Sequence, residues 1–407
     1  MTLCRFCAAP LTESFADLGM SPLSNAFIPA EQAGAMEKFY PLHAYVCGTC
    51  RLVQLGEFES PEAIFGDYLY FSSYSESWLR HAETYAQAMI ARFGLDAGSQ
   101  VVELASNDGY LLQYFQRAGI PVLGIEPAAN VAAASIAKGI ETDIAFFGRA
   151  TAERLRAAGR SADLITANNV LAHVPELNDF VAGMKILLAP SGVATVEFPH
   201  LERLIAENQF DTIYHEHFSY FSLYTVEQVF ARHGLTVVDV EELPTHGGSL
   251  RLYLRHAGSG AVSPAVEALR QREIAAGLAG PEPYARFAET VAETKAEILE
   301  FLIGARRAGK RVLGYGAPAK GNTLLNYCGI RGDMIGFTVD RSPHKQGMLL
   351  PGTHIPIRAP EALIAARPDY VFILPWNLRE EITAQLAEIL SWGGKFVVPI
   401  PRLEVLG

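Results

Sequence analysis

The chain has 407 residues, and half of them are hydrophobic. This length exceeds one ordinary core and predicts about two to three globular domains, while the composition excludes extensive disorder. The formal net charge of −11 argues against a nucleic-acid partner, because such binding needs Lys and Arg to neutralise phosphates. No apolar run is long enough to span a bilayer, and the first residues lack the order of a signal peptide. We therefore expect a cytoplasmic protein with no membrane partner.

The N-terminal segment carries two Cys-x-x-Cys pairs, formed by Cys4, Cys7, Cys47 and Cys50. Up to about residue 60 the chain has many Pro and Gly residues and no helix of useful length, so it needs a cross-link, such as a bound metal ion, to be stable. Paired thiolates at this spacing are typical of a closed, structural zinc site. The alternative is two reactive or buried cysteine pairs, and Cys328 is interpreted as a core thiol. The pattern predicts a zinc-binding module over residues 1–70.

An alternation of strands and helices follows this module. The run 74–93 carries apolar residues at helical spacing. Strands are predicted at 101–105, 121–127, 162–170 and 192–199, with helical stretches between them. Such alternation is typical of a parallel, doubly wound α/β sheet, which binds ligands beyond the carboxyl ends of its strands. We predict a Rossmann-like domain over residues 71–258.

The segment from Val101 to Gly109 resembles the first motif of class I methyltransferases, in which a small-residue turn lets the backbone approach S-adenosylmethionine. Ala105 and Asn107 stand where glycines are usual, so the motif is degenerate. Glu126 supports it, because a carboxylate at the end of the next strand can bind both ribose hydroxyls. The alternative for Glu126 is a solvated strand end. The predicted cofactor contacts are Glu103, Ala105, Ser106, Asn107, Gly109, Tyr110, Glu126, Pro127, Asn168 and Asn169.

The densest chemical cluster is YHEHFSY, from Tyr214 to Tyr220. It is not a zincin helix, since its histidines, His215 and His217, are two residues apart instead of four. A His-x-His metal site is one interpretation. The preferred one is a general base, because an imidazole titrates near operating pH and can remove a moderately acidic carbon-bound proton.

Two further histidines are candidates for the same pocket. His173, in the segment 168–176 at the substrate-facing edge, is a pocket residue or a histidine at a helix start. That segment lacks the Asn/Asp-Pro-Pro-aromatic signature of enzymes that methylate amines of bases. His246 begins the run His246-Gly247-Gly248-Ser249, which offers backbone donors to the pocket or forms a glycine hairpin turn.

Residues 259–407 are predicted to form a helical connector, at about 262–310, and a second, smaller α/β sheet. The loop from Gly314 to Asn322 joins a strand to a helix and can bind an anionic group, to which Lys320 adds a positive charge. It is neither a Walker loop nor a dinucleotide fingerprint. Asp340 ends the next strand as Glu126 does in the first half, so the two halves mimic one another. The predicted substrate contacts are His246, Gly247, Ser249, Gly316, Ala317, Lys320, Gly321, Asn322, Asp340, Lys345, Trp376 and Asn377.

The order of these motifs along the whole chain resembles the three-part family of sugar C-methyltransferases, which methylate carbon 3 of nucleotide-linked 4-keto-deoxysugars. The resemblance implies one structural zinc ion, a central S-adenosylmethionine domain and a C-terminal domain for the nucleotide-linked keto-sugar. It assigns the base to His217, with Tyr214 and Glu216 beside it and His173 and Tyr68 in the pocket. We expect a monomer or a weak oligomer.

Three other functions compete with this interpretation. The first is a zinc-ribbon RNA methyltransferase, which the acidic charge and the second α/β domain disfavour. The second is a metal-dependent enzyme that uses His215 and His217. The third is a cofactor-binding regulatory protein without turnover, which the crowded YHEH cluster disfavours.

Overall fold

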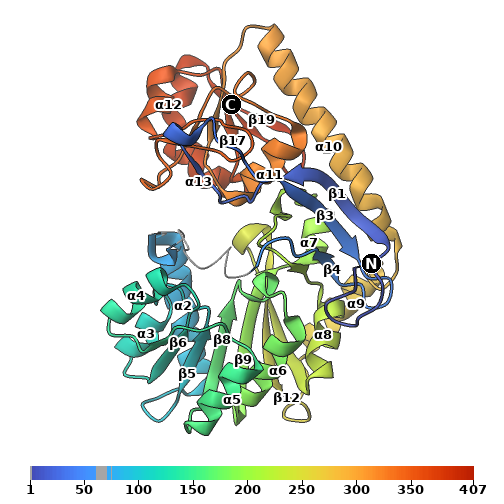
Figure 1. Ribbon diagram of the computed structural model, residues 1–407, viewed down its shortest axis with the longest axis vertical. Coiled ribbons are helices and arrows are strands. Elements are labelled where there is room, and N and C mark those ends of the chain that lie inside the picture. Colours follow the sequence, from blue (N-terminus) through green and yellow to red (C-terminus); the bar gives the residue numbers. More distant parts are fainter. Residues whose placement is uncertain (1, 61–70, 75) are drawn as a thin grey trace.

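The computed structural model describes residues 2–60, 71–74 and 76–407, which form two lobes joined along one side (Figure 1). The lower lobe is the central α/β domain, and the upper lobe is the C-terminal one. The N-terminal strands and the long helix α10 (Glu282–Arg307) run along the joining side. None of the helices in these ranges is long and apolar enough to cross a membrane.

The N-terminal module is a small antiparallel sheet that reaches both lobes. Its strands are β1 (Glu13–Ser21), β3 (Tyr40–Val46) and β4 (Val53–Leu55), and β10 (Ser219–Tyr220) joins the edge of β4. A short strand, β2 (Ile28–Pro29), pairs with β15 (Met348–Leu349) of the upper lobe. The module therefore contributes to the connection between the lobes.

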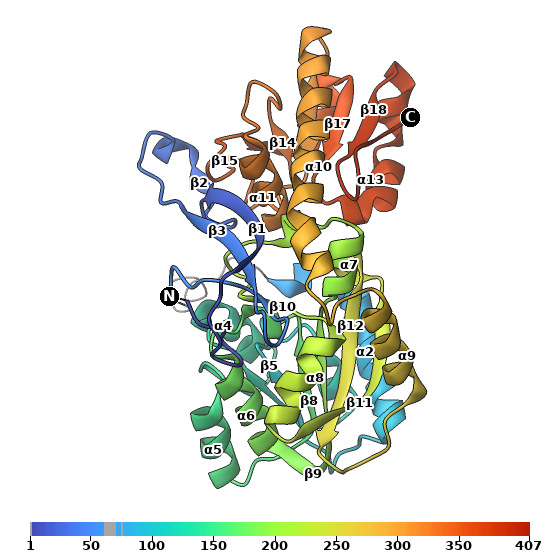
Figure 2. The ribbon, with the colours of Figure 1, turned by 90° about the vertical axis from the view of Figure 1, so that its right-hand side faces the viewer.

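The central domain has a seven-stranded sheet in the order β11-β12-β9-β8-β5-β6-β7. Only β12 runs antiparallel to its neighbours, β9 and β11. Buried residues of α5, α6 and α8 pack with one face of this sheet, and those of α2 and α3 pack with the other. In Figure 2, α5 and α6 lie on the opposite side of the strands from α2. The strands are β5 (Val101–Leu104), β6 (Val122–Ile125), β7 (Thr142–Asp143), β8 (Ala162–Asn168), β9 (Leu188–Pro199), β11 (Leu235–Leu243) and β12 (Ser249–His256). The helices are α2 (Glu76–Phe93), α3 (Leu112–Arg117), α4 (Ala129–Ala137), α5 (Arg149–Ala157), α6 (Leu177–Leu187), α7 (Leu201–Ala206) and α8 (Leu223–Arg232).

The connector consists of α9 (Pro264–Ala275) and α10 and leads to a six-stranded sheet in the order β16-β14-β13-β17-β18-β19. All neighbouring strands are parallel except the final pair, β18 and β19. The strands are β13 (Val312–Tyr315), β14 (Thr338–Val339), β16 (Ile357–Arg358), β17 (Tyr370–Ile373), β18 (Lys395–Val398) and β19 (Glu404–Leu406). The helices are α11 (Ala319–Cys328), α12 (Glu361–Ala366) and α13 (Arg379–Gln385).

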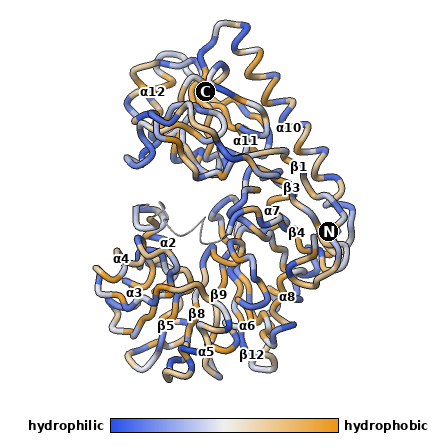
Figure 3. Tube along the Cα trace, in the orientation of Figure 1, coloured by the Kyte–Doolittle hydropathy of each residue, from blue (hydrophilic) through white to orange (hydrophobic). Residues whose placement is uncertain are grey.

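The predicted class I Rossmann-like fold with a second α/β domain is thereby confirmed. The four predicted strands of the central domain are β5, β6, β8 and β9, and the predicted helix at 74–93 begins at Glu76. Residues of β5 and β6 are all buried, as expected for strands covered on both faces. Hydropathy along the chain shows hydrophobic segments on these strands (Figure 3).

The hydrophobic cores do not follow the chain order. Leu201, Leu204, Phe210 and Ile213 follow the central strand β9, yet they pack in one cluster with the C-terminal sheet and the N-terminal strands. The cysteines Cys4, Cys47 and Cys50 instead pack with the central sheet. The segment 201–213 is therefore the part of the central domain that packs against the C-terminal domain and the N-terminal strands.

Candidate active site

One cavity of about 710 Å³ lies where the three parts of the chain meet. The central domain lines it with the ends of β5, β6 and β8, the N-terminal module with Asn25, and the C-terminal domain with Lys320 and Lys345. A cavity of this size is large enough for a small-molecule site. Its position beyond the carboxyl ends of parallel strands is the usual ligand position of such sheets.

The loop after β5 has the backbone of a glycine-rich turn although two of its residues are not glycine. Ala105 has φ +53°, Asn107 has φ +49° and Gly109 has φ +75°. Left-handed backbone is costly for alanine and tolerated by asparagine, so the fold imposes this conformation at the site. At Gly109 a Cβ would lie 2.5 Å from Ile140 Cδ1 and 2.8 Å from Ser135 Oγ, so the close packing adds to the preference of the left-handed backbone for glycine.

Glu126 organises this loop from the end of β6. Its carboxylate accepts from the amide of Asn107 at 2.9 Å and from the amide of Ala128 at 2.8 Å. Burial raises the pKa of Glu126, and these two bonds oppose that rise. The loop and the acidic strand end therefore form one unit, which excludes the alternative of a solvated strand end.

Several buried polar groups at this end of the sheet have unused bonding capacity. Neither the amide nitrogen nor the oxygen of the Asn169 side chain has a partner among the described residues, and the same holds for Glu103 Oε2 and Ser106 Oγ. Burial raises the pKa of Glu103 well above its usual value, and Glu126 and Asp108 add to that rise. Crowded carboxylates favour a cationic ligand. These acidic and polar groups therefore fit S-adenosylmethionine, which carries a sulfonium and an ammonium group.

His217 has a defined tautomer. Its Nδ1 lies 3.0 Å from the carbonyl oxygen of Thr212, and its Nε2 lies 2.8 Å from the hydroxyl of Tyr214. A carbonyl oxygen can only accept, so Nδ1 holds the proton and Nε2 accepts from Tyr214. Burial, with a contribution from His173, lowers the pKa of His217 well below its usual value. The imidazole is neutral, and Nε2 is its basic atom.

Two other histidines surround His217. His173 lies at the end of a short 3-10 helix, Leu171–His173, with its ring centre 4.7 Å from that of His217. His246 lies in the turn between β11 and β12, at φ +56°. Burial lowers the pKa of each to about 4. Both line the cavity, so His173 is a pocket residue, and the predicted hairpin at His246 also contributes to the pocket.

Glu216 faces the N-terminal module. Its Oε1 accepts a hydrogen bond of 2.7 Å from the side chain of Asn25. Burial raises the pKa of Glu216 to about 7, opposed by Asn25 and by the charge of Lys345. The side chain lines the same cavity as His217, although the two residues bind different parts of the protein.

His215 points away from this centre. Its Nε2 lies 3.2 Å from the carbonyl oxygen of Pro41, and its ring packs edge-on against Tyr40 and Phe58. His215 and His217 therefore do not converge on one point. Within residues 2–60, 71–74 and 76–407, the cysteine quartet is the single group of three or more His, Cys, Asp or Glu that could hold an ion. The His-x-His metal interpretation has no support from this geometry.

The C-terminal loops repeat the arrangement of the cofactor half. Asp340 accepts from the amides of Ala317 at 2.7 Å and Ser342 at 2.8 Å, as Glu126 does from Asn107 and Ala128. Lys345 donates to the carbonyl oxygen of Ala317 at 2.9 Å, and Lys320 donates to Asn377 at the same distance. The two half-buried ammonium groups, Lys320 and Lys345, line the cavity and suit an anionic ligand.

Trp376 joins the lobes behind the cavity. Its indole N–H donates to Asp211 at 2.7 Å, and the ammonium of Lys320 lies 4.4 Å from its ring centre. A Cβ on Gly247 would lie 2.6 Å from Trp376 Cη2, so the HGGS turn needs glycine for this close approach. The steric requirement for glycine therefore comes from Trp376 and also from Gln209, whose Nε2 would lie 2.8 Å from the same Cβ.

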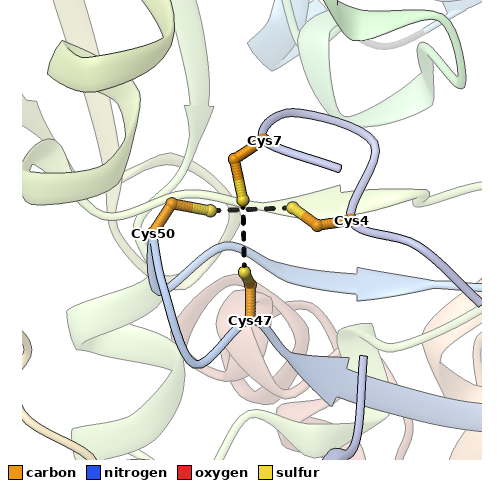
Figure 4. A group of neighbouring side chains, drawn as sticks. All are labelled: Cys4, Cys7, Cys47 and Cys50. Carbon is orange, nitrogen blue, oxygen red and sulfur yellow. Dashed lines mark hydrogen bonds between the residues drawn. The ribbon is translucent and has the colours of Figure 1, made fainter. Parts of the chain in front are cut away.

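The four cysteines converge on one point (Figure 4). The Sγ atoms of Cys4 and Cys50 are 3.6 Å apart, those of Cys7 and Cys47 are 3.5 Å apart, and all four lie within 4.8 Å of one another. Four sulfurs about 2.3 Å from a zinc ion are about 3.8 Å apart in a tetrahedron. The geometry fits one structural zinc ion and contains no disulfide.

Most predicted site residues line the cavity or support its wall. The residues that line it are Ala105, Asn107, Tyr110, Glu126, Pro127, Asn168, Asn169, His173, Tyr214, Glu216, His217, His246, Lys320 and Lys345. Those outside the lining set are Glu103, Ser106, Gly109, Gly247, Ser249, Gly316, Ala317, Gly321, Asn322, Asp340, Trp376 and Asn377. Tyr68 lies outside the described residues.

Several residues of the lining were not predicted from the sequence. Asn25, Trp78, Phe146, Phe147 and Thr212 contribute to the wall. Phe146 and Phe147 follow β7, a strand of two residues that is too short to be read from periodicity. Asn25 lies in a Pro-containing segment with no motif, and only the fold brings it to Glu216.

Three family models match successive parts of the chain. They describe a zinc binding domain at residues 4–65, a methyltransferase domain at 78–240 and a C-methyltransferase C-terminal domain at 244–401. The C-methyltransferase NovU of Streptomyces niveus is 38% identical over 404 residues, which cover 99% of this chain and 96% of the relative. A ubiquinone biosynthesis O-methyltransferase of Rhodopseudomonas palustris (strain BisA53) is 29% identical over 25% of this chain and 40% of its own length. The PH0226 protein of Pyrococcus horikoshii OT3 is a structural relative, at 15% identity, a TM-score of 0.36 and coverage of 49% of this chain and 99% of that one.

The seven-stranded sheet, the loop after β5 and the matched methyltransferase domain define an S-adenosylmethionine-dependent methyltransferase with a structural zinc site. The full-length similarity narrows this class. The chain belongs to the C-methyltransferase family that includes NovU and combines a zinc-binding domain, a methyltransferase domain and a C-methyltransferase C-terminal domain.

Proposed function

We propose that the enzyme methylates carbon 3 of a nucleotide-linked 4-keto-deoxysugar, with His217 as the general base. The observation that carries this proposal is one cavity that joins the cofactor loop, the imidazole of His217 and two half-buried lysines. The lysines would bind the diphosphate, while His217 would meet the sugar. The acceptor and the base are inferred from the chemistry of these groups and from the sequence resemblance.

The reaction needs a carbon acid. A 4-keto group acidifies the proton on the neighbouring carbon, and Nε2 of His217 takes that proton as the C–H electrons move into an enolate. The bound cofactor supplies the electrophilic methyl group that the enolate carbon accepts. Nδ1 remains bonded to the carbonyl of Thr212, so the imidazolium that forms is still held in position. Alignment of donor and acceptor contributes on the order of 7–11 kcal/mol in the best cases.

In the absence of substrate, the hydroxyl of Tyr214 is hydrogen-bonded to the basic nitrogen of His217. This hydroxyl donates to Nε2 at 2.8 Å, so the sugar must displace this bond before Nε2 can take a proton from carbon. The released hydroxyl would stay close to Nε2 and could donate to the enolate oxygen. Tyr214→Phe separates this role from that of the base: it should slow turnover but leave proton exchange measurable.

A screen of nucleotide-linked 4-keto-deoxysugars tests the proposal. The purified enzyme is mixed with each sugar in deuterated buffer, with and without S-adenosylmethionine, and methyl transfer and deuterium uptake are measured by NMR. We expect uptake at the carbon next to the ketone and a new C–CH₃ signal at the same carbon. Methylation of oxygen or nitrogen, or of no 4-keto sugar in the set, would contradict it.

A further inference from the structure

The segment that holds the base is itself held by the C-terminal domain. The short 3-10 helix Phe210–Thr212 precedes the YHEH cluster and is fully buried. Phe210 packs edge-on against Tyr327 of α11, with ring centres 5.4 Å apart. Asp211 accepts from the Trp376 indole at 2.7 Å, and the carbonyl of Ile213 accepts from Thr323 at 3.0 Å. Three of four consecutive residues therefore bind the C-terminal domain.

Thr212 is the residue that faces the other way. It lines the cavity, and its carbonyl oxygen accepts from Nδ1 of His217. The bonds at Asp211 and Ile213 flank this peptide on both sides. The peptide is also held locally, because the amide of Ile213 donates to the carbonyl of Phe210 at 3.0 Å. Two side chains of the C-terminal domain therefore add to the local bonds that orient the Thr212 carbonyl.

We propose that Trp376 and Thr323 are positioning residues that keep His217 in its Nδ1–H tautomer by fixing the carbonyl of Thr212. This inference rests on the proposed role of His217 as base. It links the domain that carries Lys320 to the proton-removing group, so that the base is aligned only when the two lobes are joined. Asp211 is well suited to this link, since its Oδ2 is bonded to Trp376 and its Oδ1 has no partner among the described residues.

The hydrogen bond from Trp376 to Asp211 lies in a buried environment. Trp376 is 6% exposed and Asp211 is fully buried, so a lost donor would not be replaced by water. Burial raises the pKa of Asp211 to about 6, and the charge of Lys320 and the indole N–H oppose this rise. Without the indole N–H, we expect the Asp211 carboxylate to shift toward another donor and the adjacent Thr212 peptide to change its orientation.

The test measures the tautomer and the rate in paired variants. Trp376→Phe keeps an aromatic ring but removes the N–H, and Thr323→Val keeps the shape but removes the hydroxyl. The ¹⁵N spectrum of histidine-labelled enzyme reports which nitrogen carries the proton, and His217→Asn identifies the His217 signals. Both variants should shift these signals toward a mixture of tautomers and lower kcat about tenfold. Binding of S-adenosylmethionine should not change.

Two controls separate positioning from general damage. Trp392→Phe removes another indole N–H of the same domain, which donates to Pro368 at 3.0 Å far from the base, and should leave the spectrum and kcat unchanged. Thr323→Ser restores the hydroxyl and should restore both readouts. If Val and Ser behave alike at 323, or if Trp376→Phe leaves the His217 signals unchanged, the proposal is wrong.

The readouts also separate this inference from the proposed function. The tautomer is measured without any sugar, so the ¹⁵N result decides the positioning role even if no 4-keto sugar is methylated. Conversely, full turnover by His217→Asn would remove His217 as the base, whatever the spectra show.

Discussion

The proposed chemistry depends on one nitrogen atom, Nε2 of His217. Asparagine at this position can still donate to the carbonyl of Thr212 but has no basic atom, so His217→Asn should abolish methyl transfer and deuterium exchange. The dissociation constant for S-adenosylmethionine, measured by calorimetry, should stay nearly unchanged, because the cofactor loop is built around Glu126. A variant that keeps more than about a tenth of the wild-type rate would exclude His217 as the base.

The pH dependence of kcat follows from the same residue. As the proposed base, His217 would be active when its imidazole is neutral, that is, above its pKa. Burial and His173 lower the pKa of His217 well below the ordinary 6.5, so the neutral form persists as the pH falls. We expect the acid limb of His217 in a profile of kcat to lie clearly below pH 6.5. The matched control is Glu216→Gln, since burial raises the pKa of Glu216 to about 7. A limb at or above 6.5 that survives this change would contradict the lowered pKa.

Among the structural elements, β10 connects the zinc module to the segment that carries His217. Ser219 and Tyr220 follow His217 by two and three residues and pair with Gln54 and Val53 of β4, next to the cysteine turn. Loss of zinc should therefore release an element beside the active site as well as the module itself.

Metal removal tests this connection. Native enzyme should contain about one zinc per chain, and chelation should lower both the melting temperature and kcat, with recovery when zinc is added. Cys47→Ser should lose the metal in the same way. Cys328→Ser is the control: the residue is a buried cysteine of α11, away from the quartet, and its variant should keep the zinc. A fully active, metal-free enzyme would show that the module does not support the site.

The elements also show what sequence patterns can and cannot predict. Strands β5, β6, β8 and β9 were predictable because each is a run of apolar residues beside a turn or a helical stretch. Strands β7 and β10 have two residues each and exist only because a partner strand lies beside them. The N-terminal cysteines predicted a metal site from their spacing, yet the packing of Cys4, Cys47 and Cys50 on the central sheet is a tertiary property.

At the scale of the whole molecule, the cavity is assembled from three parts of the chain. Motifs predicted most of its charged and polar wall, since Glu126, His217 and Lys320 each belong to a recognisable pattern. The role of Trp376 could not be predicted, because its partners Asp211 and Gly247 are more than a hundred residues away and belong to no shared pattern. Lys320 is the residue of the C-terminal domain that we expect to contribute most to substrate binding.

Substitution of Lys320 tests whether the C-terminal domain binds the nucleotide. Lys320→Ala removes a half-buried ammonium from the cavity wall and should raise the dissociation constant for a nucleoside diphosphate about 10-fold to 100-fold, the usual size of a lost charge-assisted contact. Binding of S-adenosylmethionine should not change. Lys310→Ala is the matched control, since Lys310 pairs with Asp369 at 2.9 Å on the surface of the same domain. Calorimetry measures all these constants. An unchanged constant for Lys320→Ala would place the diphosphate elsewhere, whereas equal weakening in both variants would indicate a nonspecific charge effect.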